Sequence, residues 1–197
     1  MELEKGKYLV RTARKAVEEF VKSGNKHKPS SVPAEFTKKS GVFTTLHTYP
    51  GKELRGCIGY PEPVMPLIEA LIESAVSATR DPRFPPLTES ELDNIIVEVS
   101  VLSPPEEIKA NSPDDYPKHV KIGRDGLIIE KGYYSGLLLP QVPVEWGWDA
   151  REFLDNLCMK AGLPPGSWRS GDVRISRFSG EIFAEKSPRG KVAKEKI

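Results

Sequence analysis

Net charge, cysteine and long apolar segments are all scarce in this sequence of 197 residues. The formal charge is +1, from 29 basic and 28 acidic residues, so no overall field attracts a polyanion such as nucleic acid. No segment approaches the roughly 18 apolar residues of a membrane-spanning helix. Residues Met1 to Lys5 lack the apolar region of a secretory signal. These absences, with 38% apolar residues, indicate an ordinary globular protein, which we expect in the cytoplasm.

Reactive side chains are equally few. The chain has two cysteines, Cys57 and Cys158, and three histidines, His27, His47 and His119. The thiols show no pairing signature, which fits a reducing compartment. No close Cys/His spacing suggests zinc, and no phosphate-binding glycine loop, nucleophile elbow or kinase signature occurs. The sequence therefore indicates no metal and names no cofactor.

Hydrophobic periodicity predicts an α+β protein with mainly antiparallel sheet and packed helices. Helices are predicted at residues 4–23, 64–81 and from Asp149, where Glu152 completes a capping box, and Thr88 and Glu91 form a second box. Strands are predicted at residues 41–48, 54–59, 95–102, 127–129, 137–139 and 173–184. The dipeptide Asp125-Gly126 predicts a hairpin within residues 118–130, and the basic tail from Lys186 is predicted to fray.

The order of these elements predicts two interlocked subdomains. Residues 1–40 and 88–197 are expected to form a larger α+β subdomain. Residues 41–87 are expected to form a smaller one from a hairpin and a helix, joined to a stiff proline-rich segment.

The register of that hairpin decides which side chains share a face. If Pro50-Gly51 forms the turn, Leu46 lies opposite Arg55 and Thr44 lies opposite Cys57. Arg55 and Cys57 then share one face, and His47 lies on the other face with Leu54. This register leaves Cys57 without a histidine base and argues against a cysteine–histidine pair.

Chemistry is concentrated in the segment Leu54-Arg55-Gly56-Cys57-Ile58-Gly59. A cation beside a thiol lowers its pKa and makes the cysteine reactive, and glycines allow close approach of a ligand. Cys57 is therefore a candidate catalytic residue, with Arg55, Gly56 and Gly59 as candidate ligand-binding residues. The alternative is that Cys57 is a small buried hydrophobe and the glycines serve a bulge.

Three further charged residues are candidates. Glu98, on the polar face of its strand, is a candidate acid or base, and an ordinary solvated glutamate is the alternative. Arg80 and Arg83 could form an anion-binding rim, or could merely complement the dipole of the preceding helix. Cys158 lies on a helix face that is predicted to be core.

The segment Leu54–Gly59 resembles the signature of the AMMECR family, named for a chromosomal region linked to Alport syndrome, midface hypoplasia and elliptocytosis. The similarity to a prokaryotic member extends over about Tyr8 to Lys186. Further stretches agree in the family's order: Gly41–Leu46, Arg80–Phe84, Val97–Leu102, Ile122–Leu127 and Leu137–Val142. Gln141, in the last of them, joins the expected ligand-binding residues. The resemblance implies two subdomains and a groove between them, and it implies that the signature lines this groove. It does not imply a particular catalytic activity, because the family has none that is settled.

Two functions follow as hypotheses. The first is an enzyme acting on a small anionic or peptide-end substrate, with Cys57 as nucleophile, Arg55 binding the anion and Glu98 as acid or base. The second is a non-catalytic binding or adaptor module for a protein partner. The resemblance implies a Memo-like protein or a radical S-adenosylmethionine protein as that partner.

Overall fold

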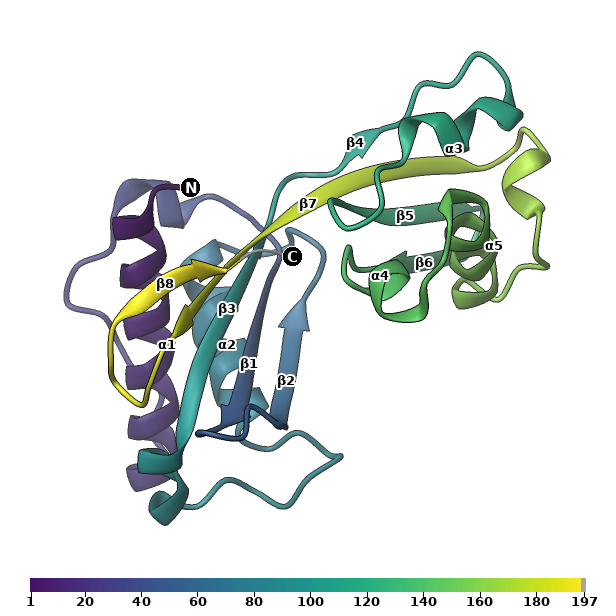
Figure 1. Cartoon of the computed structure of the whole chain (residues 1–197). Coiled ribbons are helices and arrows are strands. Elements are labelled where there is room, and N and C mark those ends of the chain that lie inside the picture. The colour runs from purple at the N-terminus through teal and green to yellow at the C-terminus, as the bar shows by residue number, and fades with distance from the viewer. Residues whose placement is uncertain (196–197) are drawn as a thin grey trace. The chain divides into compact units, whose positions relative to one another are not determined.

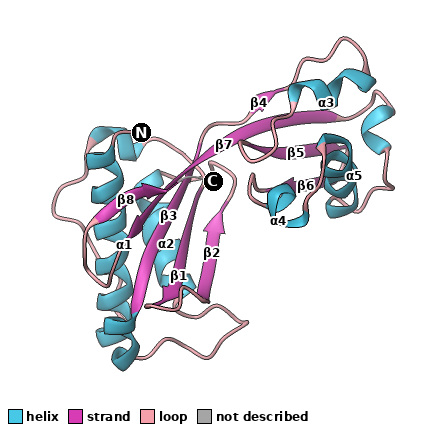
Figure 2. Ribbon diagram, in the orientation of Figure 1, coloured by secondary structure: helices cyan, strands magenta, loops and turns pink. Residues whose placement is uncertain are grey.

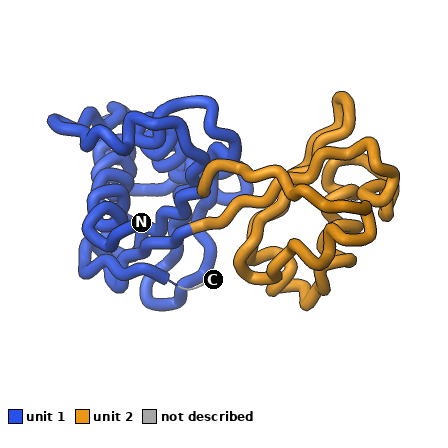
Figure 3. Tube along the Cα trace, turned by 90° about the horizontal axis from the view of Figure 1, so that it is seen from above, with its two compact units in different colours: residues 1–102, 181–196 blue, residues 103–180, 197 orange. Residues whose placement is uncertain are grey.

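A computed structural model of the chain describes residues 1–195, which form the predicted α+β fold (Figure 1). The chain divides into two compact units (Figure 3). Within the described residues, unit 1 consists of residues 1–102 and 181–195, and unit 2 consists of residues 103–180. Each unit has its own cluster of buried apolar side chains. Among the described residues, no helix is long and apolar enough to cross a membrane.

Unit 1 is a sheet covered by two helices (Figure 2). Its strands run in the order β2-β1-β3-β7-β8. The elements are α1 (Leu3–Ser23), η1 (Ala34–Thr37), β1 (Val42–Thr48), β2 (Leu54–Tyr60), α2 (Leu67–Ala78), η2 (Glu89–Asn94), β3 (Ile95–Leu102), the end of β7 (Arg174–Glu185) and β8 (Val192–Glu195).

This packing follows from apolar residues at helical spacing on α1 and from alternating apolar and polar residues on β3. Leu9, Ala13 and Val17 lie on the buried side of α1, which ends at Gly24 in the left-handed conformation, as predicted. On β3, Val97 and Val99 are fully buried. The predicted bounds and facing of β3 are confirmed. α2 begins later than predicted, because Val64 is 55% exposed and outside the helix.

A buried ion pair joins three parts of unit 1. Arg14 of α1 and Glu185 of β7 are 5% and 3% exposed. The guanidinium donates to the Glu185 carboxylate and, through Nη2, to the carbonyl of Ile95 at 2.7 Å. Glu185 also accepts the backbone N–H of Val97 at 3.0 Å. Both charges are paired and hydrogen-bonded, which makes such burial tolerable.

Unit 2 is a smaller sheet with short helices. β7 pairs with β4 (Glu106–Glu107) and β5 (Asp125–Lys131), and β5 pairs with β6 (Tyr134–Leu138). The remaining elements are η3 (Pro113–Asp115), α3 (Tyr116–His119), α4 (Val142–Trp146), α5 (Ala150–Lys160) and η4 (Ser167–Arg169). The predicted capping box at Asp149 opens α5. Cys158 is fully buried in this core, as predicted.

The division into units differs from the predicted subdomains. The hairpin and helix of residues 41–87 share one unit, and one core, with α1 and β3. The reason is that β1 pairs along its whole length with β3, while α2 packs on both α1 and β1. The separate unit is built instead from residues 103–180.

Two local predictions are wrong. Asp125-Gly126 does not turn a hairpin: the Asp125 carboxylate accepts the N–H of Lys121 and the guanidinium of Arg124. A Cβ at Gly126 would lie 2.3 Å from the Phe178 ring, so this glycine serves packing. The tail from Lys186 does not fray within the described residues, because β8 pairs with β7.

The predicted register of the β1–β2 hairpin is also wrong by one residue. Thr45, not Thr44, lies opposite Cys57, and Leu46 lies opposite Gly56. Near the turn His47 still lies opposite Leu54, so Arg55 is an extra residue at a bulge. Beyond the bulge, each side chain of β2 therefore lies on the opposite face of the sheet, relative to β1, from the one predicted.

Candidate functional site

Cys57 lies on β2, the strand at the end of the unit 1 sheet. Its backbone groups point away from β1 and are bound by the loop that follows α2. The N–H donates to Asp81 Oδ2 at 2.8 Å, and the carbonyl accepts from Arg83 Nη2 at 3.3 Å. The segment around Asp81 and Arg83 therefore covers the sheet edge at Cys57.

Asp81 and Arg83 are bound chiefly to each other. The guanidinium donates to Asp81 at 3.0 Å through Nε and 2.6 Å through Nη2. Asp81 is 2% exposed. The Arg83 hydrogen bonds, with the N–H groups of Cys57 and Arg83, hold the pKa of this carboxyl far below its ordinary value. The charge of Arg83 is thus largely neutralised within the fold.

The other two candidate arginines have separate partners. Arg55 donates to both oxygens of Glu91, at 2.7 and 3.2 Å, and this bond, with the N–H and hydroxyl of Thr88, lowers the pKa of Glu91 to about 2. Arg80 is exposed and lies over the ring of Phe20, 4.6 Å from its centroid. The three candidate arginines, Arg55, Arg80 and Arg83, therefore have three different environments.

The glycines of the signature allow close packing. A Cβ at Gly56 would lie 2.3 Å from the carbonyl oxygen of Ala78 at the end of α2. A Cβ at Gly59 would lie 2.3 Å from the ring of Phe43 on the neighbouring strand. Both positions require glycine for the fold alone.

The thiol of Cys57 is not activated by Arg55. Thr45 Oγ1 donates to Sγ at 3.2 Å. Burial raises the pKa of the thiol, as do the charges of Glu98 and Asp81, while the Thr45 hydrogen bond and Arg83 lower it in part. Since burial is the largest of these effects, Cys57 is a neutral thiol near pH 7.

The corrected register brings four polar side chains to one face of the sheet. Thr45 lies opposite Cys57 on one side and opposite Glu98 on the other. His47, two residues along β1, shares that face. Its Nε2 is 3.9 Å from Glu98 Oε2, and its Nδ1 is buried without a hydrogen-bond partner among the described residues. His47 was excluded by the predicted register, which did not include the bulge at Arg55.

His47 and Glu98 also line a pocket of about 290 Å³ in unit 1. Lys52, from the β1–β2 turn, lines it as well, and Ile96 and Ile182 provide apolar surface. Apart from the contact with His47, the Glu98 carboxylate has no polar partner within residues 1–195. Within the described residues, two polar side chains whose one polar side-chain contact is with each other thus line one small pocket.

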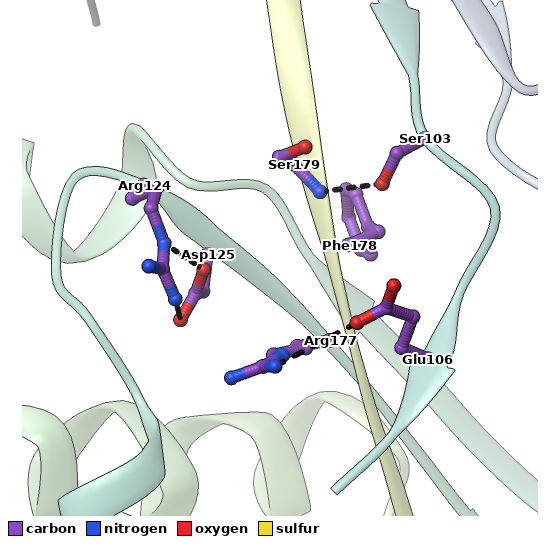
Figure 4. A pocket seen from close by; sticks show the side chains of 7 residues that line it. All are labelled: Ser103, Glu106, Arg124, Asp125, Arg177, Phe178 and Ser179. Carbon is purple, nitrogen blue, oxygen red and sulfur yellow. Dashed lines mark hydrogen bonds and ion pairs between the residues drawn. The ribbon is translucent and has the colours of Figure 1, made fainter.

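Unit 2 has a pocket of a different kind, shown in Figure 4. It measures about 280 Å³, and its lining residues are Ser103, Glu106, Arg124, Asp125, Arg177, Phe178 and Ser179. Arg124 forms a bidentate pair with Asp125, and Arg177 lies 3.6 Å from Glu106. Each charge there has an opposite charge beside it. Gln141, the remaining predicted ligand-binding residue, precedes α4 in unit 2 and does not line this pocket.

No group of three or more His, Cys, Asp or Glu side chains within the described part of the chain is placed to hold a metal ion. The polar row of Thr45, Cys57, Glu98 and His47 therefore offers hydrogen-bonding and acid–base chemistry.

The fold and this site define the class: an α+β protein of two units, whose signature strand is held at the sheet edge by an aspartate–arginine pair. The chain belongs to the AMMECR1 family, whose model matches residues 10–183. The resemblance seen in the sequence is confirmed.

Similar proteins support this assignment over the whole chain. Protein MJ0810 of Methanocaldococcus jannaschii is 59% identical over 196 residues, covering 99% of this chain and 97% of that protein. Protein PYRAB00100 of Pyrococcus abyssi is 54% identical, covering 98% of this chain and 96% of that protein. The crystal structure titled as uncharacterized protein PH0010 from Pyrococcus horikoshii is similar at 52% identity, with a TM-score of 0.86 and 98% of both chains covered.

Proposed function

We propose that unit 1 is a non-catalytic binding module, and that its binding site is the polar sheet face around His47 and Glu98. The observation that carries the proposal is the Glu98 carboxylate, which lines the pocket without a hydrogen-bond donor and has His47 Nε2 3.9 Å away. A partly buried carboxylate without a donor is stabilised by a ligand that supplies a charge-assisted hydrogen bond.

The chemistry of the site favours a ligand that donates hydrogen bonds. Glu98 accepts only, and neutral imidazole accepts at one ring nitrogen. A primary amine or an amide, on a small molecule or on a partner's side chain, matches both groups. Anionic ligands match less well, because Arg55 and Arg83 are already paired with Glu91 and Asp81.

The test uses n-butylammonium as a probe for an amine-bearing ligand. Titration into ¹⁵N-labelled protein is expected to shift amide resonances around His47 and Glu98. Glu98→Gln is expected to weaken binding about tenfold, the equivalent of one charge-assisted hydrogen bond of about 1.5 kcal/mol. Glu89→Gln is the matched control, since Glu89 is exposed in the same unit and lies outside the pocket. Equal binding by the Glu98→Gln variant contradicts the proposal.

A second candidate function, thiol catalysis by Cys57 with Glu98 and His47 as acid–base groups, rests on their shared sheet face. The raised pKa of the thiol argues against it. Alkylation by iodoacetamide as a function of pH separates the two functions, with Cys57→Ala reporting the background from Cys158. We expect a midpoint above about 8.5, the value of an ordinary thiol. A midpoint near or below pH 7 would favour the enzyme.

A further inference from the structure

A second pocket of unit 1 lies along the exposed side of α1 and is the largest of those described here, at about 470 Å³. One wall is the helix itself. The other is the link that follows α1 and runs back along it (Figure 1), with His27, Lys28, Ser30 and Ser31 facing the pocket.

Basic side chains dominate the lining. Lys7, Arg11 and Lys15 project from α1 and Lys28 projects from the link, against one acidic residue, Glu4. Lys7 is neutralised by Glu4 at 2.5 Å. Arg11, Lys15 and Lys28 have no carboxylate within salt-bridge distance anywhere in residues 1–195. The pocket therefore carries about three uncompensated positive charges in a chain whose net charge is +1.

The spacing of the cations on α1 has no benefit for folding. Lys7, Arg11 and Lys15 follow each other at intervals of four residues, so they lie one above the other on the helix. Like charges at this spacing destabilise a helix by about 0.2–0.5 kcal/mol per pair. On the same helix, buried Arg14 is fully hydrogen-bonded. The exposed stripe is thus unexplained by the fold.

The wall opposite the helix is fixed in place. Tyr8 donates to the carbonyl of Ser31 at 2.7 Å, and its ring stacks on Phe36 with centroids 5.2 Å apart. Further along, His27 Nδ1 lies 2.8 Å from a Glu19 oxygen. These contacts hold the link against α1, so that Lys28, Ser30 and Ser31 line the same pocket as Arg11 and Lys15.

We propose that this pocket binds a phosphorylated small molecule that carries at least two negative charges. A guanidinium binds phosphate oxygens in a bidentate manner, ammonium groups add point charges, and serine hydroxyls donate further hydrogen bonds. The volume is within the range of small-molecule sites. Walls on two sides and the near-zero net charge favour a small ligand over a nucleic-acid backbone, which needs an extended basic surface.

Calorimetric titration of the full chain with inorganic pyrophosphate tests the proposal at low salt. Pyrophosphate is expected to bind more tightly than orthophosphate. The double substitution Arg11→Gln with Lys15→Gln is expected to weaken binding at least tenfold. Arg11→Lys keeps the charge and loses the planar fork, so a loss of about threefold is expected. Both positions are exposed, and an unchanged melting temperature verifies the fold.

The matched control is Lys22→Gln, which removes an exposed cation from the last turn of the same helix, outside the pocket. It is expected to leave the affinity within twofold of the unmodified chain. An equal loss in this control, or undiminished binding by the double variant, overturns the proposal. So does tighter binding of a twelve-nucleotide RNA than of pyrophosphate, because that result assigns the cations to a nucleic acid.

Discussion

Arg14 and Arg11 are three residues apart on one helix and differ in almost every physical respect. Arg14 is 5% exposed and is bonded to Glu185 and to two backbone carbonyls. Arg11 is exposed, faces a pocket and has no ion-pair partner among the described residues. The same contrast separates Arg83, which is paired with Asp81, from Lys15 and Lys28. Charged side chains that form ion pairs within the protein stabilise the fold, and charged side chains without such partners are available to bind a ligand.

The largest effect is expected from removing the partner of Arg14. Glu185→Ala leaves a guanidinium buried without its carboxylate, and breaking such a pair costs about 3–5 kcal/mol. Chemical denaturation, compared with Arg11→Ala, measures the free energy of unfolding. The Arg11 variant is expected to change it by less than about 0.5 kcal/mol. Equal effects would remove the distinction between the two arginines.

A smaller loss is expected at the sheet edge. Asp81→Asn keeps an oxygen for the N–H of Cys57 but removes the charge that binds Arg83. One hydrogen bond to a charged group contributes about 1.5–3 kcal/mol, so the free energy of unfolding is expected to fall by about that amount. Hydrogen exchange at Cys57 is expected to rise as well. Unchanged exchange in the Asn variant would show that the aspartate does not hold the edge.

The smallest effect concerns Arg55 and Glu91, and it depends on pH. The pKa of Glu91 is lowered to about 2 in the folded protein, against about 4.3 in an unfolded chain. A carboxyl with a depressed pKa stabilises the fold above the unfolded value, and this contribution is lost as the pH falls toward the folded value. Because this pair is partly exposed, Arg55→Gln is expected to cost less than about 1 kcal/mol at pH 7.

Melting temperatures measured from pH 7 to pH 2 test this expectation. The difference between the unmodified chain and the Arg55→Gln variant is expected to be constant above about pH 5 and to shrink between about pH 4.5 and pH 2. A difference that stays constant over the whole range would mean that the ion pair is not its source.

Most helices and strands of unit 1 follow from periodicity, since α1, β1, β2 and β3 lie within a few residues of their predicted bounds. The exception is β8, whose segment was predicted to fray. The candidate site was less accessible to prediction. One bulged residue, Arg55, inverts the facing of the signature strand and brings His47 to the face of Cys57. The glycines suggested a bulge only as an alternative, and its position at Arg55 is seen only in the pairing of β1 with β2.

The same limit applies to the arginines. Residue type and sequence position made Arg55, Arg80 and Arg83 candidates for binding an anion, but each partner is set by tertiary packing. The partner of Arg55 is Glu91 on η2, and the partner of Arg80 is Phe20 on α1. The partner of Arg83 is Asp81, two residues earlier in the chain. The stripe of Lys7, Arg11 and Lys15 was visible in the sequence at a spacing of four. What the sequence did not show is that a separate link folds back to close a pocket over it.

The chain enters and leaves unit 2 at neighbouring residues, so the gene segment that encodes unit 2 forms one continuous insertion. Ser103 donates its N–H to the carbonyl of Ser179 at 2.8 Å, and the Ser179 N–H donates to Ser103 Oγ at 3.0 Å. Unit 2 is therefore an insertion whose first and last residues are neighbours, while β8 and the end of β7 return to complete the sheet of unit 1. A deletion of residues 103–180, bridged by a few glycines, would interrupt no core side chain of unit 1. The inserted module could thus be gained, lost or exchanged as one cassette.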